Sequence, residues 1–122
     1  MAYVDGFVFA VPKKNRAAYL KMAKVGKRMF TKLGAIDYKE CRMDDPKPPM
    51  VTRTFPKLVK PRDGEEIWFS YVVYKNKKTR DVANKKMSQM MDTATEAEKK
   101  MFTTMPFDMK RMAVGGFTVE VG

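Results

Sequence analysis

The side chains that could do chemistry in this chain of 122 residues are carboxylates, tyrosines, lysines and a single cysteine, Cys41. The chain contains no histidine, which excludes a Ser-His-Asp triad, a His-ligated haem and a Cys/His zinc site. The adjacent acidic pairs, at 44–45 and 65–66, lie beside turn residues and are typical of solvated loops rather than of a metal site. We therefore predict no metal and no cofactor, and any acid–base chemistry must depend on the remaining groups.

Asp5 is the carboxylate in the most unusual position. It lies with Gly6 inside the segment Tyr3–Val11, whose other residues are apolar on both faces of a predicted strand. An unpaired carboxylate in such a strand is costly, so we expect Asp5 to be mostly buried and either ion-paired or hydrogen-bonded. Two interpretations remain open: Asp5 sets the strand register or a subunit contact, or it acts as acid or base in a pocket.

The segment 105–117 combines a turn, a charged pair and a glycine-containing strand. Pro106 fixes its own φ, and Asp108 can accept a hydrogen bond from an amide just downstream, so a turn is predicted here. A strand should follow from near Arg111 to Val121. Within it, Gly115 and the next glycine indicate a bulge, or less often a close approach of another backbone or a ligand.

In the functional interpretation, the two ends of the chain form one site in which Asp5 is the acid or base and Arg111 holds an anionic ligand. Direct pairing of these two side chains is left open, because Asp5 lies near the start of its strand and Arg111 opens the last one. A loop amide or the other subunit is the alternative partner of Asp5. The binding residues are predicted to be Cys41, Trp68, Tyr71, Phe107 and Asp108.

The remaining segments predict the elements that would position these side chains. Asn15 and Asn76 are candidate caps of two helices, and Gly34 is a candidate stop for the first. The predicted elements are a helix from Asn15 to Leu33, a strand from Ile36 to Met43, a loop from Asp44 to Gly64 with an extended piece at Val51–Val59, a strand at Glu65–Tyr74, a helix from Asn76 to Met91 and a short helix from Thr95 to Thr103.

This order is β-α-β-β-α-β with a short extra helix, so we predict an α+β, ferredoxin-like fold: an antiparallel four-stranded sheet in a single domain over residues 1–122. In that plan both helices cover one face of the sheet. The first and third strands are apolar on both faces. The other face must therefore be covered, and we expect a homodimer joined sheet to sheet around a twofold axis.

Several short motifs distributed from the first strand to the last resemble one family. They are Tyr3–Val8 with Ala10–Pro12, Glu40-Cys41, Phe69-Ser70, Arg80-Asp81, Met105–Asp108, Lys110–Met112 and Gly115–Phe117. On these residues the chain is similar to the YbaA-like family of uncharacterised small bacterial proteins. The resemblance implies membership of the dimeric α/β-barrel superfamily, which includes cofactor-free monooxygenases and haem enzymes.

The resemblance implies a fold and a second copy of the chain as partner, but it implies no reaction, since the family has no established activity. This chain departs from the family pattern at Arg42, where an aromatic residue is usual, and around Thr52–Phe55. The missing histidine argues against the haem branch of the superfamily. A cofactor-free, oxygenase-like protein is the most that the resemblance implies.

The charge of the chain suggests a second function. The net charge is +11 and the predicted helices are rich in lysine, which favours contact with nucleic acid or another acidic partner. The alternative is that these faces are only solvated. The segment Ile67–Tyr71 lacks the ribonucleoprotein motif that stacks bases on the same fold. We expect no membrane partner and a cytoplasmic location, because no long apolar run and no basic leader is present.

The sequence therefore leaves two hypotheses from different classes. The first is a protein that binds or transforms an unknown small molecule in a pocket between sheet and helices. The second is a basic interaction protein. A closed pocket would favour the first, and a steep salt dependence of nucleic-acid binding would favour the second.

Overall fold

The computed structural model describes the backbone of residues 1–122 and the side chains of all but residues 98 and 101–103. Its strands form one antiparallel sheet in the order β2-β3-β1-β4, which confirms the ferredoxin-like plan. The elements are β1 (Tyr3–Pro12), η1 (Lys13–Asn15), α1 (Arg16–Lys32), β2 (Ala35–Arg42), α2 (Phe55–Val59), β3 (Glu65–Tyr74), α3 (Lys77–Thr93), α4 (Glu96–Thr103), η2 (Met109–Arg111) and β4 (Ala113–Thr118).

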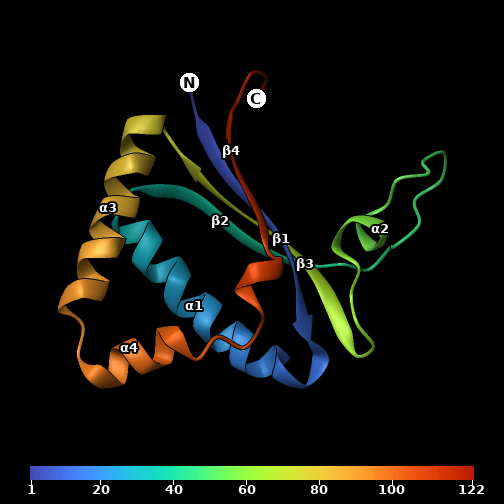
Figure 1. Ribbon diagram of the computed structural model, residues 1–122. Coiled ribbons are helices and arrows are strands. Elements are labelled where there is room, and N and C mark those ends of the chain that lie inside the picture. Colours follow the sequence, from blue (N-terminus) through green and yellow to red (C-terminus); the bar gives the residue numbers. More distant parts are fainter.

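The helices divide between the two faces of the sheet. α1, α3 and α4 lie on one side, and α2 lies on the other (Figure 1). The alternation of β3 fits this arrangement, since its helix-facing residues are buried: Trp68, Ser70, Val72 and Tyr74. On the opposite face Phe69 is 41% exposed. One face of the sheet is thus covered by helices, and the other is largely open.

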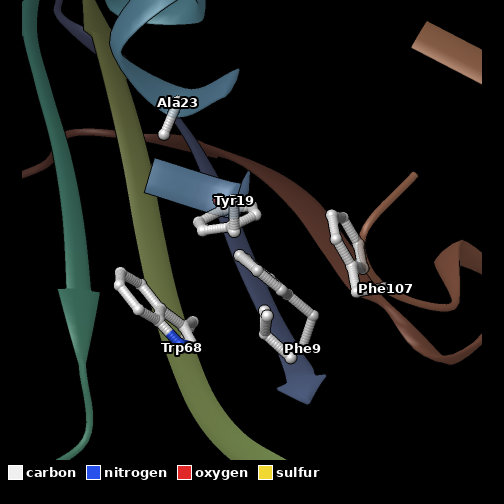
Figure 2. Close-up of a cluster of buried hydrophobic side chains, with 6 residues drawn as sticks. Phe9, Tyr19, Ala23, Trp68 and Phe107 are labelled. Carbon is white, nitrogen blue, oxygen red and sulfur yellow. The ribbon is translucent and has the colours of Figure 1, made fainter. Parts of the chain in front are cut away.

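An aromatic cluster joins α1 to the sheet and to the segment before η2. Phe9 stacks on Phe107 with ring centroids 4.8 Å apart, and the Tyr19 ring lies 5.4 Å from Phe9 and 5.1 Å from Trp68 (Figure 2). These four side chains are buried. Such ring pairs add about 1 kcal/mol each beyond the area they bury. The cluster therefore fixes the C-terminal segment against α1.

Two predicted elements differ from the structure. The piece expected to be extended at Val51–Val59 instead contains the helix α2, because Thr54 is extended and Pro56 sits in the first helical turn, where proline is tolerated. The last strand begins at Ala113, since Arg111 ends the 3-10 turn η2. Asp108 caps that turn by accepting a hydrogen bond from the Lys110 amide at 3.0 Å, which keeps the strand from starting earlier.

α2 covers only one end of the open face. Ala10 and Ile67 are register partners on that face and are 3% and 7% exposed. α2 packs against β1 and β3, and its Phe55 ring lies 6.4 Å from that of Phe69. Further along the sheet Phe117 is 60% exposed. An apolar strip beyond α2 is left without a cover in the single chain.

Candidate functional site

A hollow of about 440 Å³ lies between the helix-facing side of the sheet and the helices α1 and α3. β1, β3 and β4 form its floor, Phe30 comes from α1, and Arg80 and Asn84 come from α3. Its apolar and polar lining groups lie together in one space, as in small-molecule sites. The lining residues are Asp5, Phe7, Phe30, Val72, Tyr74, Arg80, Asn84, Val114, Gly115 and Gly116.

Asp5 is at the polar end of this hollow. It is 7% exposed, and its Oδ1 atom lies 3.7 Å from Nε of Arg80, which confirms that it is buried and ion-paired. Burial raises the pKa of Asp5, while the Arg80 charge and the Asn84 side chain oppose that rise and Asp81 adds to it. Asp5 is therefore a carboxyl group that holds its proton more tightly than a solvated one.

Arg80 is held in place by a tyrosine of β1 and by an acid of its own helix, α3. Its Nη2 atom donates a hydrogen bond of 2.8 Å to the Tyr3 hydroxyl, and its Cζ atom lies 4.6 Å from the Tyr3 ring centroid. Its Nε atom lies 3.3 Å from Oδ1 of Asp81. The Asn76 side chain caps α3 by accepting from the Thr79 amide at 2.8 Å. The cap sets the first turn of α3, and Arg80 leaves that turn toward β1.

Two polar atoms of the hollow have no hydrogen-bond partner among the described residues. They are the hydroxyl of Tyr74, a residue with 0% exposure, and Nε of Arg80. Burial raises the pKa of Tyr74 to about 12, so its hydroxyl keeps its proton and is a donor. A buried polar group without a partner costs about 1–3 kcal/mol. Both atoms can therefore donate a hydrogen bond that no described residue accepts.

The glycine pair of β4 leaves room for this arrangement. The β1–β4 register is continuous across Gly115 and Gly116, so the expected bulge is wrong, and the groups that approach these glycines are side chains rather than another backbone or a ligand. A Cβ atom on Gly116 would overlap the Tyr3 hydroxyl and lie 3.0 Å from Nη2 of Arg80. The Phe117 ring covers Gly115 on the opposite face. Glycine is needed here because side chains approach the backbone from both sides.

A partly buried acid, Glu40, lies under α1, and its carboxylate is covered by two tyrosines. It accepts hydrogen bonds from the hydroxyls of Tyr19 at 2.6 Å and Tyr38 at 2.7 Å. Burial raises the pKa of Glu40, and these two bonds oppose the rise. A Cβ on Gly26 would lie 3.2 Å from the Tyr38 hydroxyl, so this glycine lets α1 approach. The acceptor atoms of Glu40 are satisfied, which is typical of a structural acid.

Arg111 does not take part in the Asp5 site. Its guanidinium donates to both carboxylate oxygens of Glu65, at 2.7 and 2.9 Å, and also to the Lys60 carbonyl at 3.2 Å. Glu65 pairs with Pro12, whereas Val72 pairs with Asp5. At about 3.3 Å per residue the two sites are about 23 Å apart along the sheet. The prediction that Arg111 is the cation of the Asp5 site is therefore wrong, because the cation beside Asp5 is Arg80.

The other predicted binding residues are distributed over three places. Trp68 and Phe107 belong to the aromatic core. Cys41 is exposed on β2, and Tyr71 is half-buried on the open face of β3. Asp108 caps η2. The structure brings none of these five next to Asp5 in the hollow.

Sequence reasoning missed the residues that do surround Asp5. In the sequence, Arg80 belongs to the Arg80-Asp81 motif and to the basic residues of the second predicted helix, and neither pattern assigns it to the Asp5 site. A usable signal existed, because Arg80 and Asn84 are four residues apart and so share one side of α3. That side adjoins the buried row through Ala83, which is 0% exposed.

Among the side chains that the structure describes, no group of three or more acidic, cysteine or histidine residues is arranged to hold a metal ion. Within the same residues, no helix has the length and apolar character that a membrane crossing requires.

A family model and individual proteins of similar sequence agree on the relatives of this chain. A family model described as a protein of unknown function, DUF1428, matches residues 2–109. The uncharacterised protein YbaA of Escherichia coli K12 is 43% identical over 117 residues, which cover 96% of this chain and 95% of that relative, and the Shigella flexneri protein gives the same values.

Two solved structures are similar in fold. One is a variant of SnoaB, described as a cofactor-independent oxygenase from Streptomyces nogalater, with a TM-score of 0.51 and 12% identity over 99% of this chain and 95% of that one. The other is a dimeric ferredoxin-like protein from an uncultured marine organism, with a TM-score of 0.55 and 11% identity over 100% and 99% of the chains. At such identities the likeness concerns the fold alone.

Proposed function

The chain belongs to the DUF1428 family of proteins of unknown function, and from that premise we propose that it is a homodimer that binds a small molecule in the hollow beside Asp5. The observation that carries this proposal concerns Tyr74, a residue that lines the hollow and whose fully buried hydroxyl has no hydrogen-bond partner among the described residues. Proteins rarely keep such a group unless something bonds to it.

The lining of the hollow supports a binding site with a defined polar end. Phe7, Phe30 and Val72 supply apolar walls, and Asp5 with Arg80 supplies a charged end. Small-molecule sites usually combine apolar walls with a few convergent polar groups. The raised pKa of Asp5 brings its proton exchange nearer to neutral pH. Asp5 is therefore the group in this site best suited to exchange a proton with a bound molecule.

The homodimer is proposed from the open face of the sheet. Phe69 and Phe117 are 41% and 60% exposed there, and large exposed apolar patches mark interaction sites in soluble proteins. One structure of the same fold is described as dimeric. A second copy packed on this face would cover the strip that α2 leaves open.

A thermal-shift and native mass spectrometry screen against a metabolite library tests the binding function. Compounds that stabilise the protein are retested on Tyr74→Phe, which removes the unpartnered hydroxyl and keeps the ring. We expect binding at least tenfold weaker in this variant, because the ligand loses one buried hydrogen bond. The free variant should be as stable as the wild type or more stable, because an unsatisfied group is gone.

Tyr71→Phe is the matched control for this screen. It removes the same atom from the same strand, on the opposite face of the sheet. Binding should be unchanged in this variant. Ligands that bind equally to the wild type and to Tyr74→Phe would place the site elsewhere and refute the proposal.

A further inference from the structure

We propose that the ligand of this hollow is a small carboxylic acid with an apolar body, held through its carboxylate by the Tyr74 hydroxyl and Arg80 and bound together with a proton on Asp5. The inference rests on the binding function proposed above and names its ligand class. It follows from three features of the site: donors without a hydrogen-bond partner, the local charge balance and the apolar walls.

The atoms of the hollow without a hydrogen-bond partner are donors. The Tyr74 hydroxyl carries a hydrogen and has no acceptor among the described residues, and Arg80 Nε makes no hydrogen bond there, although it is ion-paired with Asp81 at 3.3 Å and with Asp5 at 3.7 Å. Arg80 also presents a planar guanidinium, whose fork suits the two oxygens of a carboxylate. A ligand that fills these positions must offer acceptor oxygens, and a carboxylate offers two.

The charges near the site decide where the proton goes. α3 contributes Arg80, Asp81 and Asn84, and β3 contributes Tyr74. β4 contributes glycines here, and α1 contributes Phe30, so neither adds a charge. Arg80 already faces Asp5 and Asp81, so a ligand carboxylate would be a further negative charge beside a buried acid. The ligand carboxylate and the Asp5 carboxylate disfavour each other's ionisation at such distances. Asp5 is the group that takes up the proton, because its burial already favours the neutral form.

The rest of the hollow selects the body of the ligand. Phe7, Phe30, Val72 and Val114 supply the apolar lining of the hollow. The volume of about 440 Å³ lies within the usual range for small-molecule sites. An aromatic or short aliphatic body would bury apolar area against these walls.

The experiment uses benzoate, cinnamate and octanoate, each paired with its neutral primary amide. Isothermal titration calorimetry from pH 5.5 to 8 in two buffers of different ionisation enthalpy measures both affinity and proton uptake. We expect at least one acid to bind at least tenfold more tightly than its amide. Its binding should take up close to one proton where Asp5 is ionised in the free protein, and its affinity should fall up to tenfold per pH unit in that range.

Two variants separate the roles of the side chains. Asp5→Asn has the volume of the neutral acid and should bind the carboxylate without proton uptake and without the pH dependence. Tyr74→Phe should weaken binding at least tenfold while keeping the proton uptake. Glu40→Gln removes the other acid whose pKa burial raises and, as the control, should leave both affinity and proton uptake unchanged.

The inference is overturned if an amide binds as tightly as its acid, if acid binding is independent of Tyr74, or if no acid binds at millimolar concentration. If amides bind to the wild type and this binding is lost in Tyr74→Phe, the carboxylic acid class is refuted and the binding function is retained. Failure of the binding function has a different signature, since library compounds would then bind equally to the wild type and to Tyr74→Phe. Circular dichroism of each variant establishes that it is folded before titration.

Discussion

Two acids of this protein, the buried Asp5 and the partly buried Glu40, have raised pKa values in different surroundings. The Asp5 carboxyl faces a cation and a hollow. The Glu40 carboxylate is closed off by the hydroxyls of Tyr19 and Tyr38. Environment rather than residue type separates acids that can exchange a proton with a ligand from acids that only support packing. Glu40 is the clearer case for measuring the cost of burial, because both of its carboxylate oxygens already accept hydrogen bonds from protein side chains.

We predict that Glu40→Gln changes the pH dependence of stability. Burial raises the pKa of Glu40 above its ordinary value of 4.5, so the native state holds this proton more tightly than the unfolded state. The stability this provides is fully present below pH 4.5 and is lost as pH rises through the raised pKa. In urea titrations, the unfolding free energy of the wild type minus that of the variant should fall over this window, by up to about 1.4 kcal/mol per pH unit.

Glu66→Gln is the control, with the opposite sign. The Glu66 carboxylate accepts a hydrogen bond from Nε of Arg16 at 2.8 Å, and this pairing lowers the pKa of Glu66. Its contribution is present above pH 4.5 and is lost as pH falls through the lowered pKa. If the two glutamine variants show the same sign of pH dependence, the assignment of raised and lowered pKa values is wrong.

At the scale of elements, two asparagines that precede helices do different work. Asn76 accepts hydrogen bonds from the amide and the hydroxyl of Thr79 and so caps α3. Asn15 precedes α1 without a side-chain cap. Its Nδ2 atom donates instead to the Pro106 carbonyl at 2.9 Å, which joins the start of α1 to the segment before η2. The expected cap at Asn76 is confirmed, and the expected cap at Asn15 is wrong.

We predict that aspartate is tolerated at position 76 and not at position 15. Asn76→Asp keeps the accepting oxygen, whereas Asn15→Asp loses the donor and faces a carboxylate toward the Pro106 carbonyl. Any gain from a negative charge near a helix N-terminus is similar at both positions and cancels in the comparison. By thermal unfolding Asn15→Asp should be about 1 kcal/mol less stable than Asn76→Asp. Equal stabilities would show that the Asn15–Pro106 bond contributes nothing.

At the scale of the whole molecule, the sheet has one covered face and one open face. The helix side carries the Asp5 hollow, and α2 with its flanking loop projects on the other side (Figure 1). The open face presents Phe69 and Phe117. It also carries Cys41 at the edge strand β2, where the thiol is exposed in the single chain. This face is where the proposed second copy would pack.

We predict a species of twice 14.1 kDa in sedimentation at micromolar concentration. Phe69→Glu should shift it toward the monomer, because the change buries a charge at the proposed contact. Leu20→Glu on α1, which is 37% exposed on the other side of the sheet, is the control and should remain dimeric. The Cys41 thiol should react more slowly with a thiol reagent in the dimer than in Phe69→Glu. A wild-type protein that sediments only at 14.1 kDa would refute the dimer.

Local patterns in the amino-acid sequence were sufficient for most of the fold. The strand Glu65–Tyr74 has the predicted bounds, since a β-branched and aromatic run between turn residues has few alternatives. The burial of Asp5 was predictable for a similar reason, because an acid within a strand that is apolar on both faces has no route to water. The helix α2 was missed because proline in a first helical turn and proline in a loop look alike in one short segment.

The partners of the charged residues depended on tertiary structure. Asp5 pairs with Arg80 and Arg111 pairs with Glu65, because the strand register separates the two ends of the sheet and the start of α3 brings Arg80 to Asp5. Likewise, Gly116 lies in a regular ladder. Glycine is needed at this position because Tyr3 and Arg80 occupy the space that a side chain would fill. The sequence by itself determined which segments form strands and helices, since those depend on neighbouring residues. Only the tertiary structure decided which side chains share a site, because contacts between residues far apart in the chain depend on register and on the direction of each helix.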